Sequence, residues 1–214
     1  MSETSPNNSD DFARSLRDPT IRLRRKSMLN APHMKRLNKY VSQLRQHSKG
    51  EVQDFDPLDG GNEALALFLL EKPGPMTANS KLGKREGSGF ISRNNDDRTA
   101  EATINFMREA KIPRELTIIW NVVPWWNGTR KVSSHELLAG VQCVKELVRL
   151  LPKLRTVVFV GQKAAKARPY LETTNLILFS SDHPSPIVRA RFPDRWRAIA
   201  SDWAKVKPVL GLSF

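Results

Sequence analysis

Four short, continuous apolar runs alternate with helix-like stretches from residue 65 onward, and this alternation limits the possible folds most. The runs are four to eight residues long and are bounded by polar, Pro or Gly residues: 65–70, 116–123, 156–161 and 176–179. Such runs are typical of strands buried on both faces, and strands that alternate with helices form mostly parallel sheets. We therefore expect an α/β fold with three layers, α/β/α, around a central, mostly parallel, four-stranded sheet.

Helical patterns fill the intervals between these runs. Apolar residues recur at helical spacing, or a glycine begins a helical turn, in four places: 100–110, 137–148, 162–168 and 196–206. Ser133 and Glu136 have the spacing of a capping box and predict where the second of these helices begins. The segment 72–96 is polar and glycine-rich, and a loop of that length is usually functional or disordered.

The N-terminal part of the chain differs in composition from the rest. We expect a disordered polar tail over 1–13, a basic and partly helical extension over 14–50, and an α/β domain over 51–214. Between residues 14 and 49 there are eleven Lys and Arg residues and a single acid, Asp18. Four apolar residues at helical spacing predict a helix there: Met34, Leu37, Val41 and Leu44. Whether its basic side faces water or DNA stays open.

Net charge and cysteine content narrow the functional class. The formal net charge of +13 on 214 residues favours a polyanionic partner, nucleic acid before membrane. The single cysteine, Cys143, excludes an internal disulfide and a four-cysteine zinc or iron–sulfur site within this chain. No run approaches the ~18 apolar residues of a membrane span, and the polar N-terminus is unlike a secretory signal. We expect a cytoplasmic, nucleoid-associated monomer without metal or cofactor.

Polar residues follow each of the four expected strands. Because parallel strands end at one edge of a sheet, these residues should gather where open α/β sheets bind their ligands. Glu71, Asn121, Lys163 and His183 are such residues. His183 begins a loop held by two prolines, and near pH 7 a histidine can act as an acid, a base or a neutral donor.

Three of these strand ends resemble motifs of the uracil-DNA glycosylase superfamily. The stretch 71–75, Glu-Lys-Pro-Gly-Pro, is similar to the superfamily's first motif. Asn121 ends a β-branched strand, as the uracil-reading asparagine of the superfamily does, and 183–186 resembles its His-Pro-Ser motif. The resemblance extends over roughly residues 60–208 and would make the α/β domain catalytic.

The resemblance implies a monofunctional DNA glycosylase of base excision repair. Such an enzyme flips uracil out of DNA and hydrolyses its N-glycosidic bond, which leaves an abasic site. Asn121 would read the base, Gly74 would contact it and Phe90 would stack on it, while His183 would stabilise the leaving anion. For Phe90, a hydrophobic anchor of the long loop is the alternative.

The resemblance also implies a set of DNA contacts after the histidine motif. Ser185 would bind a phosphate, Ile187 or Val188 would wedge into the duplex, and two arginines would meet phosphates: Arg189 and Arg191. Trp125 would line the pocket mouth or stack on a neighbouring base; packing against the following helix is the alternative. The partner would be uracil-containing DNA, single- or double-stranded.

The chain departs from the superfamily at Lys72. Most members carry Asp or Asn there to position the attacking water, and an ammonium accepts no hydrogen bond. Glu71 could orient the water instead, as a glutamate does in the iron–sulfur group, whose cysteines this chain lacks. Substrate phosphates and His183 could supply most of the catalysis, or Lys72 could be a Schiff-base nucleophile.

Other functions remain open beside uracil release. The same pocket could bind damaged or abasic DNA with little turnover, because Lys72 stands where the water should be positioned. The excised base could be another deaminated base such as hypoxanthine. A basic α/β domain that binds RNA or protein is a third possibility.

Overall fold

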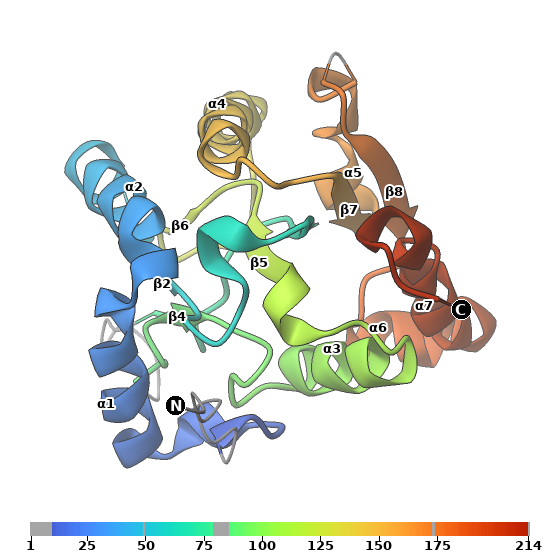
Figure 1. Cartoon of the computed structure of the whole chain (residues 1–214), viewed down its shortest axis with the longest axis horizontal. Helices are drawn as coiled ribbons and strands as arrows, with labels where there is room; N and C mark the ends of the chain where they lie inside the picture. The colour runs from blue at the N-terminus through green and yellow to red at the C-terminus, as the bar shows by residue number, and fades with distance from the viewer. Residues whose placement is uncertain (1–9, 49, 79–85, 173, 214) are drawn as a thin grey trace, which may run out of the picture.

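A parallel sheet of four strands lies at the centre of the computed structural model, which describes residues 10–48, 50–78, 86–172 and 174–213 (Figure 1). The strands are adjacent in this order: β5 (Thr117–Asn121), β3 (Ala66–Leu70), β7 (Thr156–Val160) and β8 (Ile177–Ser181). Every neighbouring pair is parallel. The predicted α/β class and the four-stranded sheet are confirmed.

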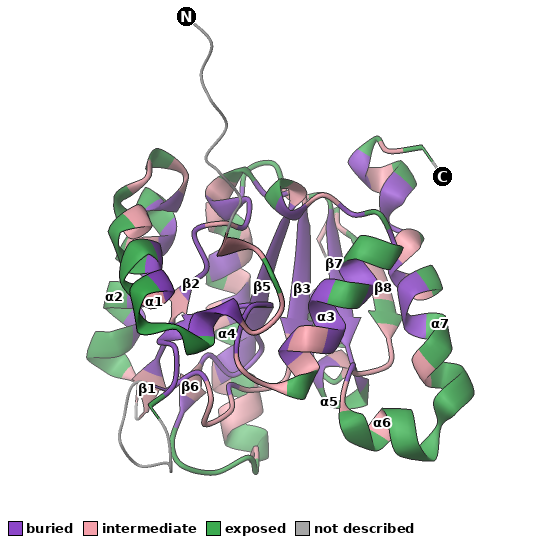
Figure 2. Cartoon of the chain, turned by 90° about the horizontal axis from the view of Figure 1, so that it is seen from below, coloured by how far each residue is buried: buried purple, intermediate pink, exposed green. Residues whose placement is uncertain are grey.

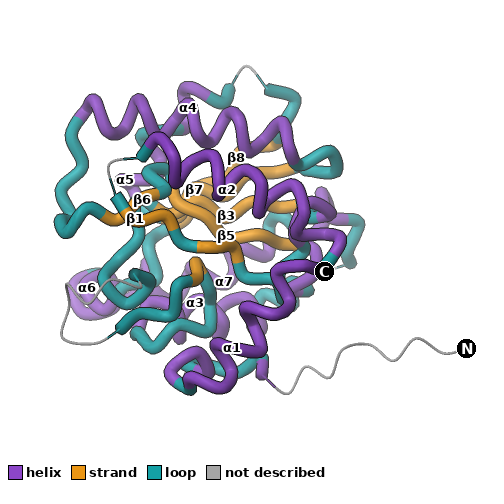
Figure 3. Tube along the Cα trace, turned by 90° about the vertical axis from the view of Figure 1, so that its left-hand side faces the viewer, coloured by secondary structure: helices purple, strands orange, loops and turns teal. Residues whose placement is uncertain are grey.

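Helices cover both faces of this sheet and complete the predicted three layers. In Figure 3, α4 (Ser134–Leu150) and α2 (Lys35–His47) lie on one side of the strands, and α3 (Arg98–Glu109) and α7 (Pro193–Ala204) lie on the other. The capping box predicted before α4 is present, with Glu136 N–H donating to Ser133 Oγ. Aromatic side chains join α3 and α7 beneath the sheet.

Burial explains why these segments form strands. All five residues of β5 and of β7 are buried, as the continuous apolar runs predict, and β8 is the more exposed edge strand (Figure 2). Phe68 of β3 meets Trp203 of α7 edge to face, with ring centroids 5.2 Å apart. The core therefore runs through the sheet and holds its strand ends in fixed positions.

The helix α2 confirms the pattern seen in the sequence. Its apolar side joins the main core, whereas Arg36, Lys39 and Arg45 are exposed. The basic segment before residue 50 thus shares its core with the α/β layers. Among the described residues, no helix is both long and apolar enough to cross a membrane.

A second helix in the basic segment, α1 (Pro19–Ser27), was not expected from the sequence. It is held by a buried ion pair in which Arg25 Nη1 lies 2.6 Å from Asp56 Oδ1. Residues 10–13, the end of the predicted tail, are described and contact the rest of the chain. The Asp10 carboxylate accepts two hydrogen bonds from Arg24, and the Asp11 carbonyl accepts one from Arg108.

Four very short strands tie the segment after α2 to the loops of the sheet. β1 (Glu51–Val52) pairs with β6 (Trp125–Trp126), and β2 (Asp54–Phe55) pairs with β4 (Phe90–Ile91). Two-residue strands carry no periodic pattern, which is why the sequence did not predict them. Short 3₁₀ helices occupy other turns: Ser15–Arg17, Met28–Asn30, Pro32–Met34, Gly61–Glu63, Arg114–Leu116, Arg168–Tyr170 and Lys207–Leu210.

Two helices beside the strand ends differ from the expectation. α5 (Gln162–Ala165) is shorter than the predicted 162–168, because the chain turns before Pro169. The wedge segment after the histidine motif is helical, not a loop, and forms α6 (Pro186–Arg191). Pro186 suits the first turn of α6, and Ser185 caps it by accepting a hydrogen bond from Val188 N–H.

Candidate active site

The C-terminal ends of the four strands bring the predicted polar residues to one edge of the sheet. Asn121 of β5 is in register with Leu70 of β3, the residue before Glu71. On the other side, Val160 of β7 is in register with Ser181 of β8, two residues before His183. Open parallel sheets bind ligands at this edge.

Asn121 presents an unused amide at the end of β5. The residue is 3% exposed, and its side chain has no hydrogen-bond partner among the described residues. Its amide atoms are not among the fully enclosed polar atoms that lack a partner in the described part of the chain, so the small exposed area of the residue includes the amide. The end of β5 therefore presents donors and an acceptor that the described part of the protein does not use.

His183 folds back from β8 over the end of β7. A Cβ on Gly161 would lie 2.9 Å from the His183 Cβ, so the histidine packs directly on that glycine. Burial, together with the charges of Lys163 and Arg130, lowers the pKa of His183 from 6.5 to about 4. The imidazole is therefore neutral at pH 7 and carries one N–H donor.

The first motif forms a tight turn after β3. The carbonyl of Gly74 accepts hydrogen bonds from the backbone N–H and from the hydroxyl of Thr77, at 3.1 and 2.7 Å. Among the described residues, one group comes near the space that a Cβ on Gly74 would occupy, the Nη2 of Arg130 at 4.0 Å. The turn thus leaves room above the glycine, with a guanidinium close by.

Lys72 is turned away from this turn and bound to the start of α4. Its ammonium donates to Asn127 Oδ1, to the Lys131 carbonyl and to Glu136 Oε1, at 2.8, 3.2 and 2.8 Å. Only 2% of the side chain is exposed. An amine held by three acceptors in this way is not free to act as a nucleophile, so the geometry favours a structural role.

Trp125 belongs to the same cluster. Its indole N–H donates to Glu136 Oε1 at 3.1 Å, and its ring packs against the main core. Burial alone would raise the pKa of Glu136, but hydrogen bonds from Lys72 and Trp125 lower it below its usual value. Of the placements considered for Trp125, these contacts agree with packing against the following helix.

Glu71 faces a small cavity between α4 and α5. Its carboxylate lies 3.1 Å from Lys163 Nζ. The cavity of about 70 Å³ is lined by Glu71 and these residues: Val123, Val132, Ser133, Ser134, Leu137, Lys163 and Lys166. A polar cavity of that size has room for water. Lys163 connects the two predicted catalytic residues, because it pairs with Glu71 and also lowers the pKa of His183.

Phe90 has no face open to a base in this structure. The ring is 0% exposed and packs with Leu16 and Ile21 of the N-terminal segment. Its backbone starts β4 beside Asp54. This placement agrees with the alternative of a hydrophobic anchor, and a stacking role would require the ring to be uncovered.

The short helix α6 presents an apolar residue at the edge of the site. Ile187 is 67% exposed, whereas Val188 is half-buried, so Ile187 is the better placed of the two expected wedges. Arg189 lies 5.9 Å from the centre of the Trp196 ring, and Arg191 is exposed. Ser185 uses its oxygen to cap α6 and keeps its hydroxyl proton available.

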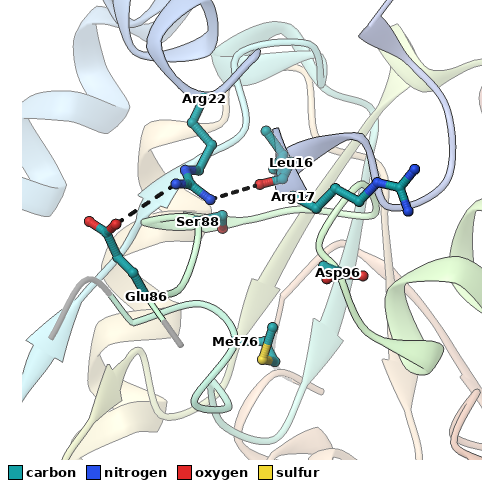
Figure 4. A pocket seen from close by; sticks show the side chains of 7 residues that line it. All are labelled: Leu16, Arg17, Arg22, Met76, Glu86, Ser88 and Asp96. Carbon is teal, nitrogen blue, oxygen red and sulfur yellow. Dashed lines mark hydrogen bonds and ion pairs between the residues drawn. The ribbon is translucent and has the colours of Figure 1, made fainter. Parts of the chain in front are cut away.

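A larger hollow of about 540 Å³ lies between the N-terminal segment and the long loop (Figure 4). Its lining includes Arg17 and Arg22, and Arg22 Nη2 lies 3.8 Å from the Glu86 carboxylate. None of the strand-end residues lines it. The volume of a hollow therefore does not identify the candidate active site, which is defined by the polar residues at the strand ends.

Comparison with protein families identifies the superfamily of the chain. A model of the uracil DNA glycosylase superfamily matches residues 83–207, more than half of the chain. The chain belongs to this superfamily. Asn121 and His183 lie inside the range that the superfamily model matches, whereas Glu71 and Gly74 precede it. A search of curated proteins finds no match.

Membership in the uracil DNA glycosylase superfamily makes this a protein of a DNA glycosylase family with a DNA partner. The part of the chain that the structure describes holds no cluster of three or more His, Cys, Asp or Glu side chains suited to a metal. Of the residues near His183, the sequence had not singled out Arg130. An arginine in a polar loop carries no pattern that separates it from other surface charges.

Proposed function

We propose that this protein is a monofunctional glycosylase that hydrolyses the N-glycosidic bond of deoxyuridine in DNA. One observation carries the proposal: a neutral, half-buried histidine two residues after β8 and an asparagine at the end of β5, whose amide has no partner among the described residues, lie at the same edge of the sheet. His183 reaches back over β7, so roughly two strand spacings, ~10 Å, separate it from the Asn121 strand. A single pyrimidine can contact both groups across such a gap.

Asn121 is the residue that selects the base. A carboxamide offers one acceptor and two donors, which match the N3–H and O4 of uracil. Cytosine has an unprotonated N3 and an amino group at these positions. The Asn121 oxygen would then face an acceptor, and the Asn121 N–H would face a donor. Because the Asn121 amide makes no hydrogen bond with the described residues, the correct base gains two hydrogen bonds without breaking any of that part of the protein.

His183 stabilises the base as it leaves. When the bond between C1′ and N1 breaks, its electrons stay on the base and negative charge develops on N1 and O2. A neutral imidazole that donates to O2 stabilises that charge in the transition state, as an oxyanion hole does. The low pKa of His183 keeps it neutral over the whole physiological range.

Glu71 orients the water that attacks C1′. Its carboxylate faces a cavity with room for water and, among the described residues, pairs with one cation, Lys163. The water oxygen bonds to C1′ and its proton passes to the carboxylate or to solvent. Lys72 takes no part in this step, because its ammonium is bound to the start of α4.

DNA reaches the site across α6. Ile187 enters the duplex as the apolar wedge, and Arg189 and Arg191 meet phosphates on either side. Flipping a nucleotide costs a few kcal/mol and least for an unpaired base. Single-stranded or mispaired uracil is therefore the easiest substrate.

Binding of damaged or abasic DNA with little turnover is the second candidate. Lys72 favours this candidate, because it occupies the place of the usual water-positioning residue. Its ammonium donates to Asn127 and Glu136 instead of holding a water. In that case the protein would hold extruded uracil or an abasic site tightly and release no base.

A panel of oligonucleotides tests the proposal. Single-stranded and duplex DNA containing one uracil, hypoxanthine or cytosine is incubated with excess protein, and the freed base is identified by mass spectrometry. We expect uracil alone to be released by the wild type and some cytosine to be released by Asn121→Asp. Tight binding without release of any base supports the second candidate, and release of hypoxanthine alone replaces uracil as the substrate.

A further inference from the structure

Arg130 differs from the other cations beside the candidate site. It is exposed on the loop between β6 and α4, and its Nη2 lies above the Gly74 turn. Its guanidinium makes no hydrogen bond or ion pair with any residue that the structure describes. A guanidinium offers five N–H donors in a planar fork, so Arg130 can donate several hydrogen bonds to a ligand at the edge of the site.

Three neighbouring cations already have counter-ions. Lys163 pairs with Glu71 at 3.1 Å, and Lys72 pairs with Glu136 at 2.8 Å. Beyond His183, Arg195 pairs with Asp182 at 2.5 Å. Arg130 differs from these three because it forms no ion pair with a described residue, although burial raises the pKa of Asp97 and the charge of Arg130 helps to lower it.

The proposed reaction creates a need for such a charge. Bond cleavage transfers both bonding electrons to the base, and the attacking water supplies the oxygen of the abasic sugar and releases one proton. Until it takes up a proton from solvent, the freed base is an anion with charge on N1, O2 and O4. His183 is neutral and supplies a dipole, so the site still lacks a full positive charge facing the base.

We infer that Arg130 is a catalytic residue that contacts the base and stabilises the anion as it departs. This inference rests on the proposed glycosylase function. Arg130 reaches the base from the Gly74 turn, and its charge is also close enough to His183 to help lower the pKa of that residue. Gly128, two residues earlier, has φ +83°, and a Cβ there would meet no described atom within 4 Å. The contact is solvent-exposed, and salt should weaken it.

Leaving groups of different basicity test this inference. Single-stranded oligonucleotides carry one deoxyuridine or one 5-fluorodeoxyuridine, and base release is measured with protein in excess. 5-Fluorouracil forms a more stable anion than uracil does, so its departure depends less on stabilisation by the protein. The variants are Arg130→Ala, Arg130→Lys and the matched control Lys131→Ala, which removes one exposed positive charge from the same loop.

We expect Arg130→Ala to slow uracil release by about tenfold or more, to slow release of 5-fluorouracil much less, and to be partly rescued by Arg130→Lys. Lys131→Ala should affect both bases slightly and equally. An equal loss on both bases in Arg130→Ala overturns the inference alone and makes Arg130 a DNA contact. If the wild type releases neither base, the proposed function fails and the inference fails with it.

Discussion

His183 rests directly on Gly161: a Cβ added to the glycine would lie 2.9 Å from the Cβ of the histidine. Gly161 also has φ +92°, a conformation that residues with a side chain rarely adopt. The end of β7 therefore sets the position of the histidine that ends β8. Any side chain at residue 161 must move the imidazole or the strand end.

The first prediction concerns this contact. Gly161→Ala should destabilise the fold by about 1–2 kcal/mol through its positive φ and should slow uracil release at least about tenfold by displacing the donor. Gly211→Ala is the matched control, because Gly211 has φ +75° with nothing within 4 Å of its Cβ position. Urea denaturation and single-turnover kinetics separate the two effects. Equal activity of both variants would show that the position of His183 is unimportant.

The second prediction concerns the protonation of His183. Its pKa in the folded protein, about 4, lies below the ordinary value of 6.5. The neutral ring therefore contributes to stability fully above pH 6.5, and this contribution is lost as the pH falls toward 4. NMR titration should show one of the four histidines protonating near pH 4, and Lys163→Met should raise that midpoint. A midpoint near 6.5 for His183 would remove the case for a buried neutral donor.

The third prediction concerns Lys72. Lys72→Met should lower the free energy of unfolding by about 0.5–1.5 kcal/mol, because it removes three hydrogen bonds to acceptors at the exposed start of α4. The exposed Lys39→Met should change it little. Borohydride should trap no covalent complex between the wild type and uracil-containing DNA. A trapped complex that disappears in Lys72→Met would instead make Lys72 the nucleophile.

The fourth prediction concerns the wedge. Ile187→Ala should slow uracil release from duplex DNA by about tenfold and from single strands much less, since the wedge replaces a stacked base only in a duplex. Leu23→Ala is a matched control, because Leu23 is equally exposed, at 68% against 67%, on α1. If both variants lose the same activity on both substrates, α6 does not open the duplex.

The sheet could be predicted from the sequence because each strand carries its own signal. β5 and β7 are buried along their whole length and are therefore continuous apolar runs. α1 was missed because one of its two buried residues is Arg25, and a buried arginine looks like a surface charge until its partner is known. That partner, Asp56, lies 31 residues away.

The part of the candidate site that could be predicted consists of residues at or just after the end of a strand, because the strand fixes where they lie. Asn121 and His183 end parallel strands, so their presence at one edge follows from the fold. The setting of Lys72 depends on Glu136, 64 residues later, and the burial of Phe90 depends on Leu16 and Ile21. Such contacts between distant segments have no local pattern, and neither does the unpaired guanidinium of Arg130.

The most direct measurement is the amount of free uracil that the wild type and His183→Ala release from a single-stranded oligonucleotide with protein in excess. We expect complete release by the wild type, an abasic site in the product, and release at least about a hundredfold slower from His183→Ala. No release by the folded, DNA-binding wild type over hours, or equal rates for the two proteins, would contradict a site built around His183.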